Sequence, residues 1–189
     1  EKLAHHDGGY STWRVDITAA LKEGKNLIVI AVDNTANDRV YPQMADFTFY
    51  GGLYRNVNII SVPKSHFDLD FLGSEAIKVT PQKNGADFDA ELEVYLTGAQ
   101  DSQTLKFTVY DAEGNVVDTV TQPASDTRVV IKIPNAVLWN GRKNPYLYRA
   151  EVELLDGETV LDVTGANFGC RTFEIDPNKG FILNGESYP

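Results

Sequence analysis

The sequence has a single cysteine, Cys170, and little helical periodicity, and both deficits limit what the protein can be. One cysteine excludes an internal disulfide and a cysteine-based zinc cluster, so folding requires no oxidising compartment. Because apolar residues rarely recur every three or four positions, a mainly helical fold is excluded. No apolar run approaches the ~20 residues that a membrane-spanning helix needs. These absences predict a soluble, globular protein without a membrane segment.

Positive charge is also scarce. The chain has 17 Lys and Arg residues against 27 Asp and Glu residues, giving a net charge of -10. The basic residues form no stripe that could follow a phosphate backbone, so nucleic acid is not an expected partner. Residues 1–6 show neither the apolar core nor the cleavage site of a signal peptide. A cytoplasmic location is compatible with this start, and a periplasmic one stays open.

Short stretches of alternating apolar and polar residues recur between turn signals, which is typical of β-sandwiches. In the clearest stretch, 87–96, the even-numbered apolar residues share one face and acidic residues share the other. The same pattern predicts strands at 67–71, 105–109, 129–133, 148–154 and 168–175, with turns at 111–115 and 156–157. About seven short strands in roughly 110 residues is the content of an immunoglobulin-like sandwich.

The first sixty residues have fewer strand signals. We expect strands at 13–17, 27–32 and 56–62, a helical turn at 18–21 capped by Thr18, and a chain reversal at 24–26. Residues 27–32 are apolar on both faces, which suggests a strand covered on both sides. Because three strands cannot close a two-sheet sandwich, we predict an incomplete N-terminal module that exposes apolar surface unless something covers it.

Two segments are more specific than strand patterning. The first is Asp46-Phe47-Thr48-Phe49-Tyr50-Gly51-Gly52-Leu53-Tyr54-Arg55, preceded by His6-Asp7-Gly8-Gly9-Tyr10. The second combines Leu138-Trp139, Asn144-Pro145-Tyr146-Leu147-Tyr148, residues 168–175 and Gly180-Phe181-Ile182-Leu183-Asn184-Gly185. In this order and spacing they resemble family 2 of the glycoside hydrolases, the bacterial β-galactosidases, β-glucuronidases and β-mannosidases. The first motif resembles the β-galactosidase branch more than the other two.

The resemblance implies an all-β chain in which a partial jelly roll is followed by an immunoglobulin-like sandwich. Residues 1–62 would be the C-terminal part of the jelly-roll sugar-binding domain, 63–175 the sandwich, and 176–189 the segment leading into a catalytic (β/α)₈ barrel. In such enzymes two barrel glutamates ~5 Å apart perform a retaining double displacement, and both would lie beyond Pro189. The chain would thus hold no catalytic residue and be inactive alone. It would brace the barrel of a homo-oligomeric enzyme that acts on a β-galactoside-type carbohydrate.

Asp46 is the residue to which the resemblance assigns a role. It would touch the sugar, or a sodium ion beside it, and a carboxylate suits both tasks because it accepts hydrogen bonds and is a hard oxygen ligand. No cofactor is expected within the chain, whereas the full enzyme would use sodium or magnesium. Tyr50, Gly51, Gly52 and Arg55 would support the loop.

Purely structural roles for the same loop residues stay open. Asp46 could be a turn residue that binds its own backbone. Phe49, Tyr50 and Tyr54 could stack on a sugar or anchor the loop to the core, with anchoring favoured. For Arg55 a structural ion pair or binding to carbonyl groups is favoured over substrate contact.

Other residues with ligand or acid chemistry are expected to be structural. His5, His6 and Asp7 are consecutive, so they would point apart rather than converge on zinc. Each of two carboxylate pairs, Glu91 with Glu93 and Glu151 with Glu153, lies on the polar face of an alternating strand, which favours a solvated surface over an acid and a nucleophile.

Two alternative functions are a free-standing carbohydrate-binding module and a surface-adhesion sandwich. The fold alone cannot exclude either one. The barrel-entry motif at 180–185 argues against both, because neither module needs the start of a barrel.

Overall fold

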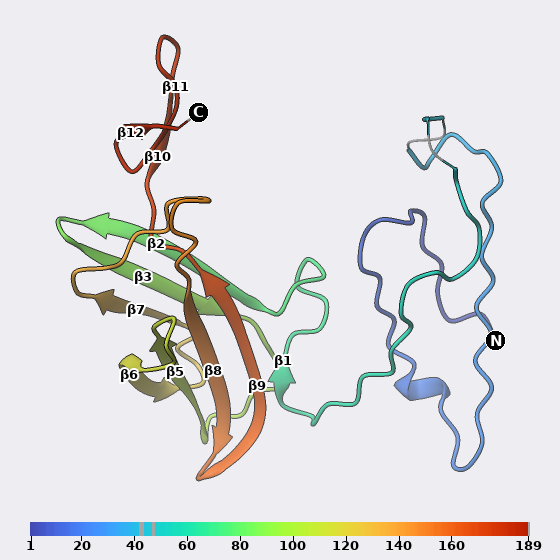
Figure 1. The fold of residues 1–189 in the computed structure, drawn as a ribbon. Coiled ribbons are helices and arrows are strands. Elements are labelled where there is room, and N and C mark those ends of the chain that lie inside the picture. The colour runs from blue at the N-terminus through green and yellow to red at the C-terminus, as the bar shows by residue number, and fades with distance from the viewer. Residues whose placement is uncertain (42–43, 47, 189) are drawn as a thin grey trace. The chain divides into compact units, whose positions relative to one another are not determined.

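The computed structural model describes residues 1–41, 44–46 and 48–188, and the chain divides into two compact units, Glu1–Ser61 and Val62–Pro189. In the described residues the one helical element is a 3₁₀ turn, η1 (Thr18–Ala20), and all other regular structure is strand (Figure 1). The predicted all-β class is confirmed. No helix in the described ranges has the length and apolar character needed to cross a membrane.

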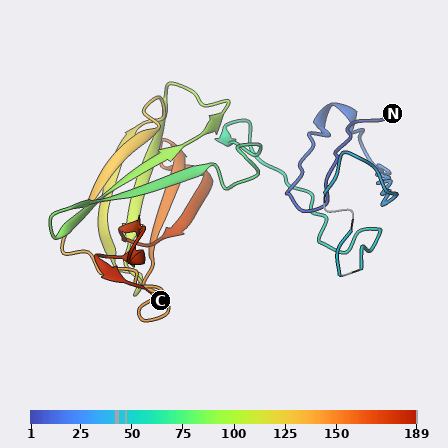
Figure 2. The same ribbon diagram turned by 90° about the horizontal axis from the view of Figure 1, so that it is seen from above.

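The second unit contains a sandwich of two antiparallel sheets, which pack face to face (Figures 1 and 2). The three-stranded sheet has the order β2 (Ile77–Asn84), β3 (Asp87–Val94), β7 (Arg128–Ile133). The four-stranded sheet has the order β6 (Val116–Pro123), β5 (Gln103–Tyr110), β8 (Tyr148–Asp156), β9 (Thr159–Phe168). Because the chain passes from one sheet to the other between β3 and β5 and again on either side of β7, the topology is that of an immunoglobulin-like sandwich.

The core lies between these two sheets. In β3 buried and partly exposed residues alternate along the whole strand. The strands opposite contribute fully buried side chains on every second residue: Leu105, Phe107 and Val109 from β5, and Ala150, Val152 and Leu154 from β8. Burying each large apolar side chain contributes about 1.5–3 kcal/mol, so this layer of contacts supplies most of the stability of the unit.

Several predicted strands are confirmed, namely those at 105–109, 129–133 and 148–154, which form β5, β7 and β8. The strand predicted at 87–96 ends at Val94, because Leu96 belongs to a separate short strand, β4 (Leu96–Thr97), which pairs with β1 (His66–Phe67). The strand predicted at 67–71 is wrong beyond Phe67. There the chain turns, since the Asp68 carboxylate accepts a hydrogen bond from the amide of Asp70 at 2.6 Å.

The first unit differs from its prediction. Its described residues contain no strand, so the strands expected at 13–17, 27–32 and 56–62 are wrong as paired elements. Backbone amides and carbonyls of an extended segment need a neighbouring strand to form a ladder, and the described residues of this unit provide none. The expected exposure of apolar surface is observed, because Leu27 and Val29 are 90% and 80% exposed.

Two local features of the first unit follow the sequence more closely. The helical turn is present as η1, but Thr18 is not its cap. Ile17 is the N-cap residue and makes no side-chain cap bond. The Asp16 carboxylate accepts a local hydrogen bond from the Thr18 amide at 2.8 Å. The reversal at 24–26 is confirmed: the Asn26 side chain accepts from the Lys22 amide at 2.9 Å and donates to the Lys22 carbonyl at 2.8 Å.

The chain ends in a small sheet of three strands, β10 (Phe173–Asp176), β11 (Gly180–Leu183) and β12 (Glu186–Ser187). It projects from one end of the sandwich (Figure 1). The predicted strand at 168–175 is thereby divided, since Phe168 ends β9 and Phe173 begins β10.

Candidate functional site

The sugar-binding prediction rests on the motif at 46–55. Asp46 is exposed, and Phe47 of the same motif lies outside the described residues. Asn34 ties the loop to a neighbouring turn, since its amide donates to the carbonyl of Phe49 at 3.4 Å. Gly51 packs so closely on Asn34 that an added Cβ would lie 3.1 Å from that side chain, and Gly52 has a φ of +84°. The glycine pair therefore permits a contact and a backbone angle that other residues resist.

The turn that holds Asn34 is itself well ordered by side chains. The Asp33 carboxylate accepts hydrogen bonds from both the amide and the hydroxyl of Thr35, and these bonds lower the pKa of Asp33. The Asn37 side chain accepts from the amides of Arg39 and Val40 at 2.9 and 3.1 Å. Sequence reasoning missed Asn34 as a loop support, although Asp and Asn at positions 33, 34 and 37 are a typical turn signal.

Two tyrosines of the loop face solvent, whereas Phe49 is half-buried. Tyr50 and Tyr54 are 77% and 62% exposed, so the expectation that they anchor the loop to a core is wrong. The guanidinium carbon of Arg55 lies 5.8 Å from the centre of the Tyr54 ring, a cation–π contact rather than the ion pair that was expected. Exposed tyrosine rings next to a carboxylate are suited to stacking on the apolar face of a sugar.

Asp46 brings one carboxylate to this loop, and a cation site needs further ligands. The described residues include no group of three or more His, Cys, Asp or Glu side chains able to hold a metal ion. His5 pairs with Asp7 at 3.2 Å, and Arg39 pairs with the same carboxylate at 3.3 Å. His6 instead stacks on Trp13 with ring centres 5.6 Å apart. The two histidines thus serve different contacts.

The carboxylate pairs of the sandwich are engaged by cations on neighbouring strands. Glu93 accepts a hydrogen bond from Arg128 at 3.0 Å, and this bond lowers the pKa of Glu93. Glu153 binds Lys106 at 2.7 Å. A lowered pKa keeps a carboxyl ionised at neutral pH, which is the opposite of what a catalytic acid requires. These surfaces are solvated, as expected, and cross-strand ion pairs organise them.

The second sequence motif converges on one structural junction. Asn184, in the tight turn between β11 and β12, accepts a hydrogen bond from the Thr172 amide at 2.9 Å and donates to the Trp139 carbonyl at 3.0 Å. The Trp139 amide donates to the carbonyl of Cys170 at 2.9 Å. Arg171 lies over the indole ring of Trp139, 4.8 Å from its centre. The residues between 138 and 185 that looked unusual in sequence therefore attach the C-terminal sheet to the sandwich.

The interior of this junction leaves little room for change. An added Cβ at Gly169 would lie 2.7 Å from the Cβ of Trp139, so only glycine permits that approach. The Cys170 thiol is fully buried, and burial raises its pKa to about 11. A thiol with so high a pKa is mostly protonated at neutral pH and is a poor nucleophile. Cys170 is a packing residue.

A tyrosine also fixes the entry to β8. The Tyr148 hydroxyl accepts a hydrogen bond from the amide of Val137 at 2.9 Å, while its ring is buried against Phe168. This arrangement matches the tyrosine corner of immunoglobulin-like domains, in which a tyrosine at the start of the corresponding strand binds backbone upstream.

Comparison with known proteins agrees with these observations. The family model described as glycosyl hydrolases family 2 matches residues 75–171, more than half of the chain. A β-glucuronidase of Bacteroides fragilis is 29% identical over 99% of this chain and 28% of its own length. A β-galactosidase of Thermoanaerobacter pseudethanolicus is 27% identical over 98% of this chain and 25% of its own. The crystal structure of an FMN-binding β-glucuronidase from Faecalibacterium prausnitzii is 36% identical, with a TM-score of 0.85 over 97% of this chain and 29% of that one.

The sandwich and its junction define an all-β domain of the kind found in these glycosidases. The chain belongs to family 2 of the glycosyl hydrolases. It spans about a quarter of the length of the curated relatives described above.

Proposed function

We propose that this chain acts within a β-glycosidase, where the sandwich braces the catalytic domain and the loop at 46–55 reaches into the sugar pocket. One observation carries the proposal: an exposed carboxylate, Asp46, stands on a loop that Asn34 and the Gly51–Gly52 pair hold in a defined shape. A carboxylate that recognises a ligand needs oxygens that are not already occupied by hydrogen bonds within the protein. Among the described residues no hydrogen bond to the Asp46 side chain is found.

The role of Asp46 follows from its chemistry. Ionised carboxylate oxygens accept hydrogen bonds from two sugar hydroxyls or bind a hard cation such as sodium or magnesium. We propose that the complete enzyme uses such an ion in its sugar pocket, with Asp46 as one ligand. Tyr50 and Tyr54 would flank the same sugar, since both rings are exposed.

The first candidate substrate is a β-galactoside, which the loop motif at 46–55 favours. A β-glucuronide is the second candidate. It is supported by the names of the Bacteroides fragilis relative and of the Faecalibacterium prausnitzii structure. The two substrates differ in charge, so nitrophenyl β-galactoside and nitrophenyl β-glucuronide separate them in a direct assay.

The test is an Asp46→Asn exchange in an enzyme that contains this segment. Asparagine keeps the size but loses the charge, and a hydrogen bond to a charged group contributes about 1.5–3 kcal/mol, so kcat/KM should fall about tenfold to a hundredfold. Asp38→Asn is the matched control, because Asp38 is also exposed but lies outside the loop. Sodium dependence should weaken in the Asp46 variant alone. Equal activity of both variants would refute the role of Asp46.

Two further properties belong to the same proposal. The 189-residue chain should release no nitrophenol from either substrate, and hydrolysis that rises in proportion to its concentration would contradict the absence of catalytic residues.

The complete enzyme is proposed to be a homo-oligomer, which size-exclusion chromatography with light scattering can determine.

A further inference from the structure

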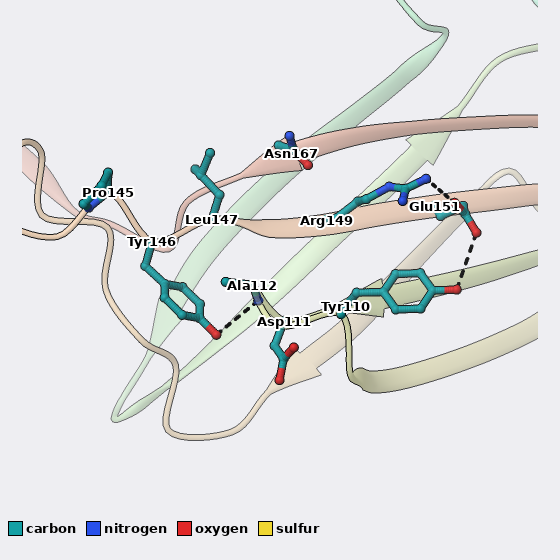
Figure 3. A pocket seen from close by; sticks show the side chains of 10 residues that line it. Tyr110, Asp111, Ala112, Pro145, Tyr146, Leu147, Arg149, Glu151 and Asn167 are labelled. Atoms are coloured by element: carbon teal, nitrogen blue, oxygen red, sulfur yellow. Dashed lines mark hydrogen bonds and ion pairs between the residues drawn. The ribbon is translucent and has the colours of Figure 1, made fainter.

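The outer face of the four-stranded sheet carries a pocket that the proposed function does not use. It has a volume of about 690 Å³ and lies where the ends of β5, β8 and β9 meet the 111–114 turn and the 145–147 loop (Figure 3). Its main side chains are Tyr110, Asp111, Tyr146, Arg149, Glu151 and Asn167. The volume is within the range of about 300–1,000 Å³ that is usual for small-molecule sites. All of these residues belong to the second unit.

The wall formed by Tyr146 is fixed before any ligand arrives. Its hydroxyl accepts a hydrogen bond from the Ala112 amide at 3.2 Å and donates to Glu113 at 3.1 Å. Its ring meets that of Tyr148 edge to face, with centres 5.1 Å apart. Asp111 closes the adjacent turn by accepting from the amides of Glu113 and Asn115 at 3.0 and 2.8 Å. A ligand would therefore meet a wall that loses little conformational entropy on binding.

The floor is a row of polar side chains on neighbouring strands. Arg149 forms an ion pair with Glu151, and the Tyr110 hydroxyl donates to the same carboxylate over a long 3.4 Å (Figure 3). Asn167 lies beside Arg149 on the next strand and is exposed. In the described part of the chain the side-chain amide of Asn167 makes no hydrogen bond, so it offers both a donor and an acceptor to a ligand.

The charge of the pocket narrows the ligand class. Asp111 and Glu151 supply two carboxylates against the single guanidinium of Arg149, which is already paired. This balance disfavours phosphates, sulfates and uronates. Neutral sugars combine hydroxyls that donate and accept with an apolar ring face that packs on tyrosine, and the pocket offers amide, carboxylate, guanidinium and aromatic groups together.

We propose that this pocket is an accessory binding site for a neutral oligosaccharide. The ring of Tyr110 packs on a sugar face, while Glu151, Arg149 and Asn167 bind hydroxyls. The site involves neither Asp46 nor hydrolysis, so it can fail while the proposed function stands, and the reverse also holds.

The experiment is a titration of the ¹⁵N-labelled 189-residue chain with cellotetraose, followed by amide chemical shifts. Because the pocket is open and few groups bind, a dissociation constant of about 1 mM is expected. Shifts should concentrate at Tyr110, Arg149 and Asn167. Digalacturonate, an acidic sugar, and a proline-rich decapeptide serve as competing ligand classes, and both should bind at least about tenfold more weakly.

Matched variants separate the pocket from the rest of the sheet. Glu151→Gln should weaken cellotetraose binding about fivefold, because it loses a charged acceptor. Glu153→Gln is the control, since Glu153 lies on the same strand and face and is also ion-paired, but does not line the pocket. Tyr110→Ala should abolish measurable binding and Tyr110→Phe should retain most of it, because the ring remains. An unchanged amide spectrum away from the pocket verifies the fold of each variant.

Several outcomes would overturn the site. No shift at saturating concentrations of cellotetraose would refute it, as would shifts confined to residues outside the pocket. Equal losses of cellotetraose affinity in the Glu151 and Glu153 variants would refute the site, because they would show a general effect of charge. Tighter binding of digalacturonate or of the peptide would refute the neutral-sugar assignment.

Discussion

The two units of this chain use similar amino acids with opposite results. Residues 27–32 are an uninterrupted apolar run, yet Leu27 and Val29 face solvent. In β5 and β8, Phe107 and Val152 are fully buried. The difference is pairing: β5 is bonded to β6 on one side and to β8 on the other, whereas the described part of the first unit has no ladder. Apolar sequence favours a strand, but only a neighbouring strand and an opposing sheet make it one.

The largest expected difference between the two units is in amide hydrogen exchange. Amides of β5 and β8 exchange only when the sandwich opens, whereas residues 27–32 have no backbone partners in the described structure. Opening a domain costs about 5 kcal/mol or more, so exchange in β5 should be at least about a thousandfold slower. Mass spectrometry of exchanged peptides measures this ratio. Comparable protection of 27–32 would show that the first unit forms a sheet in solution.

A pair of alanine substitutions tests the same contrast energetically. Phe107→Ala removes a fully buried ring and should lower the free energy of unfolding by about 3–5 kcal/mol. Val29→Ala removes an 80% exposed side chain and should change it by less than about 0.5 kcal/mol. Urea unfolding followed by circular dichroism measures both. If Phe107→Ala does not fold, Phe107→Leu is the milder form, with a smaller loss in the same direction. A large loss from Val29→Ala would contradict the contrast.

The sandwich could be predicted from sequence where alternation is strict, as in β3, because one face meets the core and the other meets water. Two of its edge strands, β2 and β6, could not, although a third, β7, could. Pro81 lies within β2, where proline disfavours a strand, but β2 is at the edge of its sheet, where a missing amide is tolerated. β6 is at the other edge of the sandwich and exposes most of its residues, so its periodicity is weak. Edge strands are defined by their position in the fold, which local sequence does not record.

The candidate sites also differ in whether local sequence reveals them. Asp46 was found through a resemblance and through its chemistry, which are properties of a short segment. Asn34, which supports the loop, is distant in sequence from the residue it binds, Phe49. The pocket around Tyr110 and Asn167 depends on strand register, which brings together residues 57 positions apart. Contacts of this kind follow from pairing and could be identified only after the sheet was known.

The C-terminal sheet should have a protection from hydrogen exchange between those of the two units. We expect this protection to depend on the side-chain bonds of Asn184. Asn184→Ala removes the bonds to Thr172 and Trp139 and places alanine at a φ of +54°. Losing these interactions costs about 1–3 kcal/mol, so amides of 173–187 should exchange about tenfold to a hundredfold faster while β5 is unchanged. Asn178→Ala in the same sheet is the control, since the Asn178 side chain makes no bond in the described structure. Equal effects of the two variants would show that the sheet is not held through Asn184.

The smallest expected effect is a pH dependence that arises in the sandwich but not in the first unit. Hydrogen bonds from Lys132 to Asp87 and from Arg128 to Glu93 lower the pKa of each carboxyl below its ordinary value, 3.8 and 4.5 respectively. A lowered folded-state pKa gives stability that is present above the ordinary value and is lost as the pH falls through the folded-state pKa. The urea midpoint of the sandwich should therefore decrease on acidification below about pH 4.5.

Asp16 and Asp33 in the first unit also have lowered pKa values, but their hydrogen bonds come from Thr18 and Thr35, two residues along the chain. Such local bonds can persist after unfolding, so they create little difference in proton binding between the two states. Lys132→Gln should accordingly flatten the acid dependence of the urea midpoint, whereas Thr35→Val should leave it unchanged. If Thr35→Val produced the larger change, the titration would belong to the first unit, and that unit would contribute to cooperative folding although its described residues form no strand ladder.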